Sequence, residues 1–135
     1  MTRAAMSAIT RQDLTTILLF GIHIAKIDDN FDVWEKRILK RFADRMHLSD
    51  AERAELLHQE ISLGRELRNL SSKDALTLLV KTLCAVSYVD GKANDEELQF
   101  IERVVSASGE PVMLMPREEW GVYEEEVFHT LDEVA

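Results

Sequence analysis

Apolar residues recur along most of this chain at intervals of three and four, the spacing that gathers them on one face of an α-helix. No stretch of useful length alternates apolar and polar residues with a period of two, so no strand is predicted. The pattern predicts helices over about 10–27, 32–46, 49–63, 72–89, 94–108 and 117–134, with a further turn possible in 65–70. We therefore expect an all-α fold of six or seven helices in one compact domain that spans residues 1–135.

Punctuating residues set the ends of these helices. Four starts pair a small polar residue with an acid three positions later, the form of a capping box: Thr10–Asp13, Asp32–Glu35, Ser49–Glu52 and Asn94–Glu97. Gly64 is expected to end the third helix and Gly109 the fifth, whereas Gly21 lies inside the first and indicates a close helix crossing. A basic run, Lys36, Arg37, Lys40 and Arg41, is expected to form the solvated side of the second helix.

The stretch 10–42 occurs twice. Displaced by 62 positions it lies on 72–104 without a gap, and five residues are then identical: Leu14/Leu76, Thr15/Thr77, Asp28/Asp90, Glu35/Glu97 and Arg41/Arg103. The apolar positions of the two copies also coincide. Internal repetition of this length indicates a supersecondary unit used twice, and the unit predicted here is helix, acidic turn, helix. The loop and helix of 109–135 lie outside it.

The two acidic turns are the candidate chemistry. Asp28 and Asp90 fall at the carboxyl ends of their helices, where the helix dipole makes an acid unfavourable and a bound cation would reverse that cost. Glu35 and Glu97 follow seven residues later, so each turn brings two hard oxygen donors near one point. Asp32 and Asn94 are secondary candidates. Such oxygen ligands suit Ca²⁺, and also Mg²⁺ or Mn²⁺.

A structural explanation competes with this one. A capping box alone accounts for Glu35 and Glu97, and Asp-Asp-Asn and Asp-Gly are ordinary turn sequences. Neither accounts for a repeated Asp at the unfavourable end of a helix. The turns are not EF-hands, because in the first copy Val33 occupies the position of the required glycine and Leu39 that of the bidentate glutamate.

The segment from Cys84 to Glu97, with Phe100 and Ile101 behind it, resembles the hallmark of the TerB-like domains of tellurite-resistance proteins. That hallmark is an apolar helix, an Asp-Gly turn and a Glu seven residues after the Asp, and 28–35 matches it more loosely. The resemblance implies a single all-α domain of two pseudo-repeats that binds a divalent cation at Asp90 and Glu97, and at Asp28 and Glu35. It also implies a role in bacterial stress-response complexes, often near membranes.

Composition narrows the function further. A formal net charge of −9 disfavours nucleic acid, whose phosphates need clustered Lys and Arg. No apolar run approaches the roughly 20 residues that span a bilayer, and the start does not have the form of a secretory signal. At most a peripheral membrane association is expected. The single cysteine, Cys84, excludes an internal disulfide and offers no redox pair. We expect a cytoplasmic protein that does not itself handle tellurite.

Two functions compete. The first is a non-enzymatic, cation-binding adaptor with unidentified protein partners. The alternative is a metal-free interaction module that uses the apolar loop 112–115, which could equally form a lid over the core. Enzyme activity is not expected, because no phosphate loop, nucleophile motif or metal-ligand histidine pair is present.

Overall fold

The computed structural model describes residues 9–27, 36–88, 95–109, 112 and 114–134. Within them the chain forms α2 (Arg11–Ile27), α3 (Arg37–Arg45), α4 (Asp50–His58), α5 (Leu63–Arg68), α6 (Lys73–Ser87), α7 (Asp95–Ser108), the 3₁₀ helix η2 (Arg117–Val122) and α8 (Tyr123–Val134). These residues contain no strand. The predicted all-α class is confirmed. No described helix is both long enough and apolar enough to cross a bilayer.

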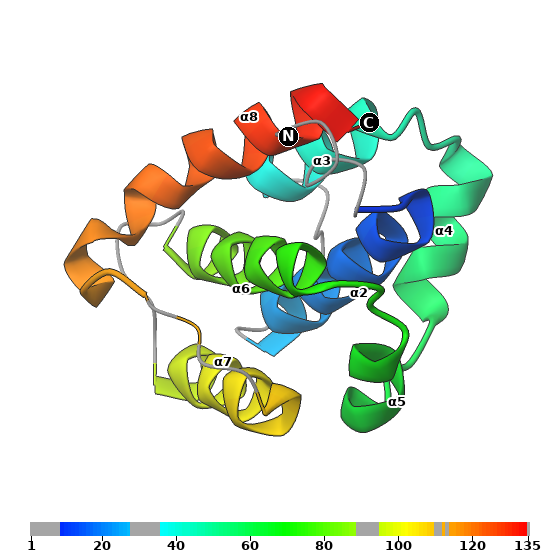
Figure 1. Cartoon of the computed structure of the whole chain (residues 1–135). Coiled ribbons are helices and arrows are strands. Elements are labelled where there is room, and N and C mark those ends of the chain that lie inside the picture. The colour runs from blue at the N-terminus through cyan, green and yellow to red at the C-terminus, as the bar shows by residue number, and fades with distance from the viewer. Residues whose placement is uncertain (1–8, 28–35, 89–94, 110–111, 113, 135) are drawn as a thin grey trace.

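Two helices, α2 and α6, form the centre of the fold. They pack against each other more extensively than any other pair, and Figure 1 shows the other helices arranged around them, with α8 and α3 on one side and α7 on the opposite side. Both are apolar over most of their circumference, which is typical of a helix enclosed by others. Their buried side chains are part of a single hydrophobic core that also includes residues of α3, α7 and α8.

Gly21 explains how closely α3 approaches α2. A Cβ atom at this position would lie 2.8 Å from Cδ2 of Leu39, a side chain of α3 with no exposed surface. Only a hydrogen fits there, so the close crossing predicted from Gly21 is confirmed. The core side of this segment also contains Ile38 and Phe42 of α3 and its C-cap residue Met46, all buried as the pattern predicted.

Most helix starts agree with the predicted caps. At α2, the Oγ1 atom of Thr10 accepts a hydrogen bond from the backbone N–H of Asp13, and Oδ2 of Asp13 accepts one from the N–H of Thr10. Ser49 and Glu52 form the same reciprocal pair at α4. The cap predicted at Asn94 lies outside the described residues. The α7 helix ends before Gly109, whose φ is +71°.

Three local predictions are wrong. The α3 helix begins at Arg37 and not after Asp32, because the backbone of Lys36 is extended. Lys36 is also buried, at 7% exposure, and so does not belong to a solvated side. Gly64 does not end α4, which stops at His58, and instead lies within α5. The last helical stretch starts at Arg117, as predicted, but its first six residues form the 3₁₀ helix η2 and α geometry starts at Tyr123.

The proposed repeat stays a prediction. The α2 and α6 helices begin at Arg11 and Lys73, positions that the displacement of 62 relates to each other. The helices after the turns do not correspond in the same way, since α3 begins at Arg37 whereas the equivalent of the α7 start is Val33. The turns themselves lie outside the described residues.

Candidate functional site

Glu97 is the one predicted ligand that the structure describes. It is the third residue of α7 and has only 2% of its surface exposed, whereas its neighbours Asp95 and Glu96 are exposed. The reason is its helical position, because Phe100 and Ile101 follow at three and four residues on the same buried face. A carboxylate removed from water is costly unless hydrogen bonds or a cation compensate it. A helix cap exposed to solvent would not require this burial.

The end of α6, which precedes the second acidic turn in the sequence, also has a buried polar group. Ser87 is the last residue of α6 and is 3% exposed, and its hydroxyl makes no hydrogen bond with the described part of the chain. Tyr88 is the C-cap residue of α6, and its N–H donates to the carbonyls of Cys84 and Ala85. Buried oxygen atoms therefore flank the acidic turn in the sequence, one from the end of α6 and one from the start of α7.

The remaining predicted ligands, Asp28, Asp32, Glu35, Asp90 and Asn94, lie outside the described residues. Among the residues that are described, no three His, Cys, Asp or Glu side chains gather in a way that could hold a metal ion. The structure does correct one expectation about the first turn. Because α3 begins at Arg37, Glu35 comes before that helix in the sequence, whereas Glu97 lies within the first turn of α7.

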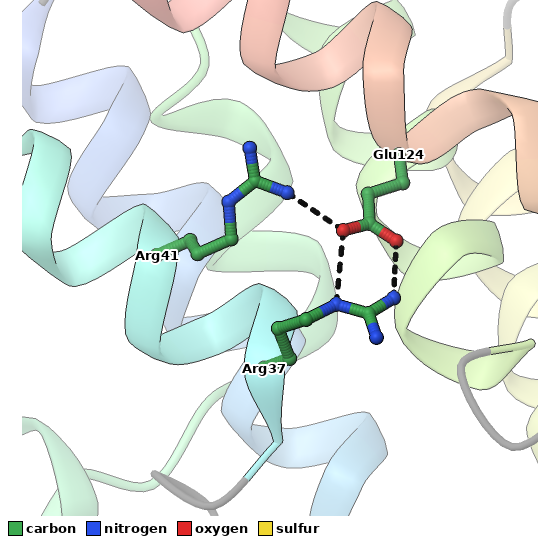
Figure 2. A network of polar contacts seen from close by, with 3 residues as sticks. All are labelled: Arg37, Arg41 and Glu124. Carbon is green, nitrogen blue, oxygen red and sulfur yellow. Dashed lines mark hydrogen bonds and ion pairs between the residues drawn. The ribbon is translucent and has the colours of Figure 1, made fainter.

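Two arginines of α3, Arg37 and Arg41, pair with a glutamate of α8. Figure 2 shows Nε and Nη2 of Arg37 donating to both carboxylate oxygens of Glu124 on α8, at 3.2 and 2.6 Å, while Nη1 of Arg41 donates to one of them at 2.7 Å. The guanidinium carbon of Arg41 lies 3.9 Å from the ring centroid of Phe128. The hydrogen bond from Arg37 is the main reason that the pKa of Glu124 is lowered. Arg37 keeps 61% of its side-chain surface exposed, as the predicted solvated side requires, but sequence reasoning missed its pairing with Glu124.

Spacing offered a partial signal for the network. Arg37 and Arg41 are four residues apart on α3, and Glu124 and Phe128 are four apart on α8, so each pair shares a helix face. Which faces meet is decided by packing between segments about eighty positions apart, and no local pattern encodes that. The network joins the helix after the first turn to the last helix of the chain.

Two other residues of chemical interest have structural surroundings. Cys84 is fully buried, and this burial raises the pKa of its thiol to about 12, so it is uncharged at neutral pH. His23 is exposed, and its ring centroid lies 4.8 Å from that of Phe100. Partial burial, with Lys26 and Arg103 nearby, lowers the pKa of His23.

The loop 112–115 is held against the core. Its described residues, Val112, Leu114 and Met115, are half-buried. The phenol oxygen of Tyr123 accepts a hydrogen bond from the N–H of Met115 at 2.8 Å, and Nε1 of Trp120 donates to the carbonyl of Met115 at 2.9 Å. These bonds support the lid interpretation of the segment around Met115, while Val112 and Leu114 also line a hollow beside α7.

Comparison of the chain with models of protein families, with curated proteins and with solved structures gives no match.

Proposed function

We propose that this protein is a non-enzymatic helical adaptor that binds a divalent cation at the acidic turn between α6 and α7. Asp90 and Glu97 are the principal ligands, with Asn94 as a secondary one. Asp28, Glu35 and Asp32 are their counterparts in the first turn. The observation that carries the proposal is the burial of Glu97, whose side chain faces inward from the first turn of α7 with 2% exposure.

Electrostatics favours a cation at the second turn. The carboxyl end of α6 contributes partial negative charge from its last carbonyls, and the connection to α7 adds Asp90 and the buried Glu97. If the turn brings these two carboxylates together at the end of α6, as the sequence predicts, they repel each other and a divalent ion converts this repulsion into attraction. The buried hydroxyl of Ser87 at the end of α6 adds a further oxygen to the same region of the chain.

The first turn supports the proposal less strongly. Its Glu35 precedes α3 instead of occupying a helical first turn, and the next residue, Lys36, is a buried cation. A lysine next to acidic residues in the sequence reduces the net negative charge that would attract an ion. We therefore expect the second turn to bind a cation more tightly than the first.

Cation binding would fix the angle at which α6 and α7 dock, and an adaptor needs such a fixed surface to recognise a partner. The similarity of 84–97 to TerB-like domains favours the same function, in a bacterial stress response of the tellurite-resistance type. Ca²⁺ fits the predicted ligands, as do Mg²⁺ and Mn²⁺.

The experiment is a thermal melt of the metal-free protein with and without each of these ions. At a cation concentration ten times the dissociation constant, binding to the folded state adds about 1.4 kcal/mol of stability, which raises Tm by roughly 4–8 °C in a domain of this size. We expect Asp90→Asn and Glu97→Gln to abolish the shift and EDTA to reverse it in the wild type.

Glu96→Gln is the matched control, because Glu96 is an exposed neighbour in the same helical turn. It should keep the full shift. Glu97→Gln also separates two roles of this residue in the metal-free protein. If the buried carboxylate is a cation ligand, removing its charge should raise the stability of the metal-free fold. If Glu97 is only a helix cap, its loss should lower that stability. A melt that no divalent ion changes would refute the proposal.

A further inference from the structure

An open hollow of about 490 Å³ lies between α7 and the segment that leads into α8. Residues from one face of α7 form its first wall, and the second wall comes from the loop and η2. The lining residues are Leu98, Ile101, Glu102, Val105 and Ser106 on α7, with Val112, Leu114 and Trp120 opposite. Its volume is within the range of sites that bind another molecule. We call this feature the α7 groove.

The floor of the α7 groove is apolar and incompletely covered. Ile101 and Trp120 are buried at 2% and 5% exposure, but Leu98, Val105 and Leu114 remain half-exposed. Other half-exposed aliphatic side chains lie elsewhere in the described chain, among them Leu57, Ile61 and Leu67. Four such side chains, Leu98, Val105, Val112 and Leu114, line this one groove, and a cluster of partly exposed apolar groups is typical of a binding surface.

The second wall of the α7 groove is fixed in place before any partner arrives. Trp120 and Tyr123 hold the backbone of Met115 by two hydrogen bonds, at 2.9 and 2.8 Å. Leu114, the residue before Met115, is thereby held opposite α7. A preformed wall lowers the conformational cost of binding.

The rim of the α7 groove is acidic. Asp95 and Glu102 are seven residues apart and exposed on the stripe of α7 that also carries Leu98, and no basic residue shares that stripe. Glu102 is the charged residue among those that line the groove. The rim therefore favours a positively charged partner and repels an anionic one.

We propose that the α7 groove binds a basic amphipathic helix of a partner protein. The groove face of α7 runs from Leu98 to Ser106, about 12 Å or two helical turns, which matches aliphatic side chains spaced at three or four residues on a docked helix. Lysine or arginine residues beside that apolar stripe lie against Asp95 and Glu102. This partner chemistry goes beyond the proposed cation function and does not depend on it.

The test uses two fluorescein-labelled peptides of roughly 18 residues, each long enough to form a helix. One has leucine at helical spacing and lysine elsewhere, and the other replaces every lysine with glutamate. Binding is followed by fluorescence anisotropy at low and high salt. We expect the lysine peptide to bind at least tenfold more tightly than the glutamate peptide at low salt, and this preference to shrink at high salt.

Two charge reversals locate the binding. Glu102→Lys changes the rim of the α7 groove, while Glu55→Lys makes the same charge change on an exposed position of α4, a helix that does not line the groove. Both positions are exposed, so neither change is expected to affect folding. We expect Glu102→Lys to weaken the lysine peptide about three- to tenfold and Glu55→Lys to leave it within about twofold. Leu114→Ala, which removes part of the floor, should weaken it about tenfold.

Three outcomes would overturn the inference. Equal weakening by Glu102→Lys and Glu55→Lys would show a general attraction to net charge. Equal binding of the two peptides would show an apolar groove without the proposed preference. Binding of the uncharged dye N-phenyl-1-naphthylamine, lost in Leu114→Ala, with neither peptide bound, would show a small-molecule pocket. A cation-dependent melt is read separately, so failure here leaves the cation proposal intact.

Discussion

Asp13 ties two distant parts of the chain together, and its removal should cost more than the loss of a helix cap. Its carboxylate has no exposed surface. It accepts hydrogen bonds from the N–H of Thr10 at 2.9 Å, from the N–H of Ser71 at 2.9 Å and from the hydroxyl of Ser71. The carboxylate therefore caps α2 and also anchors the residue that precedes the cap of α6.

The magnitude of the effect follows from the groups left without acceptors. Asp13→Ala removes a cap, worth about 1 kcal/mol, and leaves the N–H of Ser71 without its carboxylate acceptor, at about 1–3 kcal/mol. We expect the free energy of unfolding to fall by about 2–4 kcal/mol. Asp74→Ala is the control, because Asp74 is an exposed acid in the first turn of α6, and its loss should cost about 0.3–1 kcal/mol.

Urea unfolding at 25 °C, followed by circular dichroism at 222 nm, measures both variants. Ser71→Ala should cost about 1 kcal/mol by itself, and the double variant should cost less than the sum of the two single changes because the residues share a hydrogen bond. If Asp13→Ala and Asp74→Ala lose equal stability, the link to Ser71 contributes nothing and the reasoning is wrong.

The same carboxylate makes stability depend on pH. Burial acts to raise the pKa of Asp13, but hydrogen bonds from Ser71 and Thr10 outweigh it and lower the pKa below the ordinary value of 3.8. A group whose pKa is lower in the folded state contributes stability above its unfolded pKa and loses it as pH falls through the folded one. The wild type should therefore lose stability below about pH 4, and Asp13→Ala should lose less over the same range.

Two further predictions test packing and charge. Gly21→Ala should destabilise the fold by roughly 1 kcal/mol, since the new Cβ would lie 2.8 Å from buried Leu39 and overpacking outweighs the gain in helix propensity. Gly64→Ala should instead stabilise the fold by up to about 1 kcal/mol, because the nearest atom is 3.7 Å from the new Cβ. If urea unfolding shows that both substitutions stabilise the protein, or that both destabilise it, this packing account is wrong. Glu124→Gln should cost about 1 kcal/mol at low salt and less in 1 M NaCl, because Glu124 joins two arginines, while Glu126→Gln, with Lys81 as its partner, should cost a few tenths. As the pKa of Glu124 is lowered from 4.5, chiefly by its hydrogen bond with Arg37, its contribution should be present above that pH and disappear as pH falls further; a salt-independent loss in urea melts would contradict the ion-pair account.

Local chemistry made much of the fold predictable. The caps at Thr10, Ser49 and Ser72 depend on contacts within three residues, and the buried faces of α2 and α6 depend on helical periodicity alone. The burial of Glu97 was also open to prediction, because it shares a helix face with Phe100 and Ile101. A cap or a metal ligand at Glu97 does not by itself require burial, so only the shared helix face predicts it.

Tertiary packing decided the rest. Nothing near Asp13 in the sequence indicates that it bonds to Ser71, 58 residues away. Nothing near α3 indicates that Arg37 and Arg41, although still partly solvated, pair with Glu124 of α8. The extended backbone at Lys36 makes α3 begin four residues later than its equivalent in the repeat, α7, would require. Periodicity and caps arise from neighbours along one helix and can be read from the chain, whereas the pairing of faces depends on free energies shared among segments that meet only after folding.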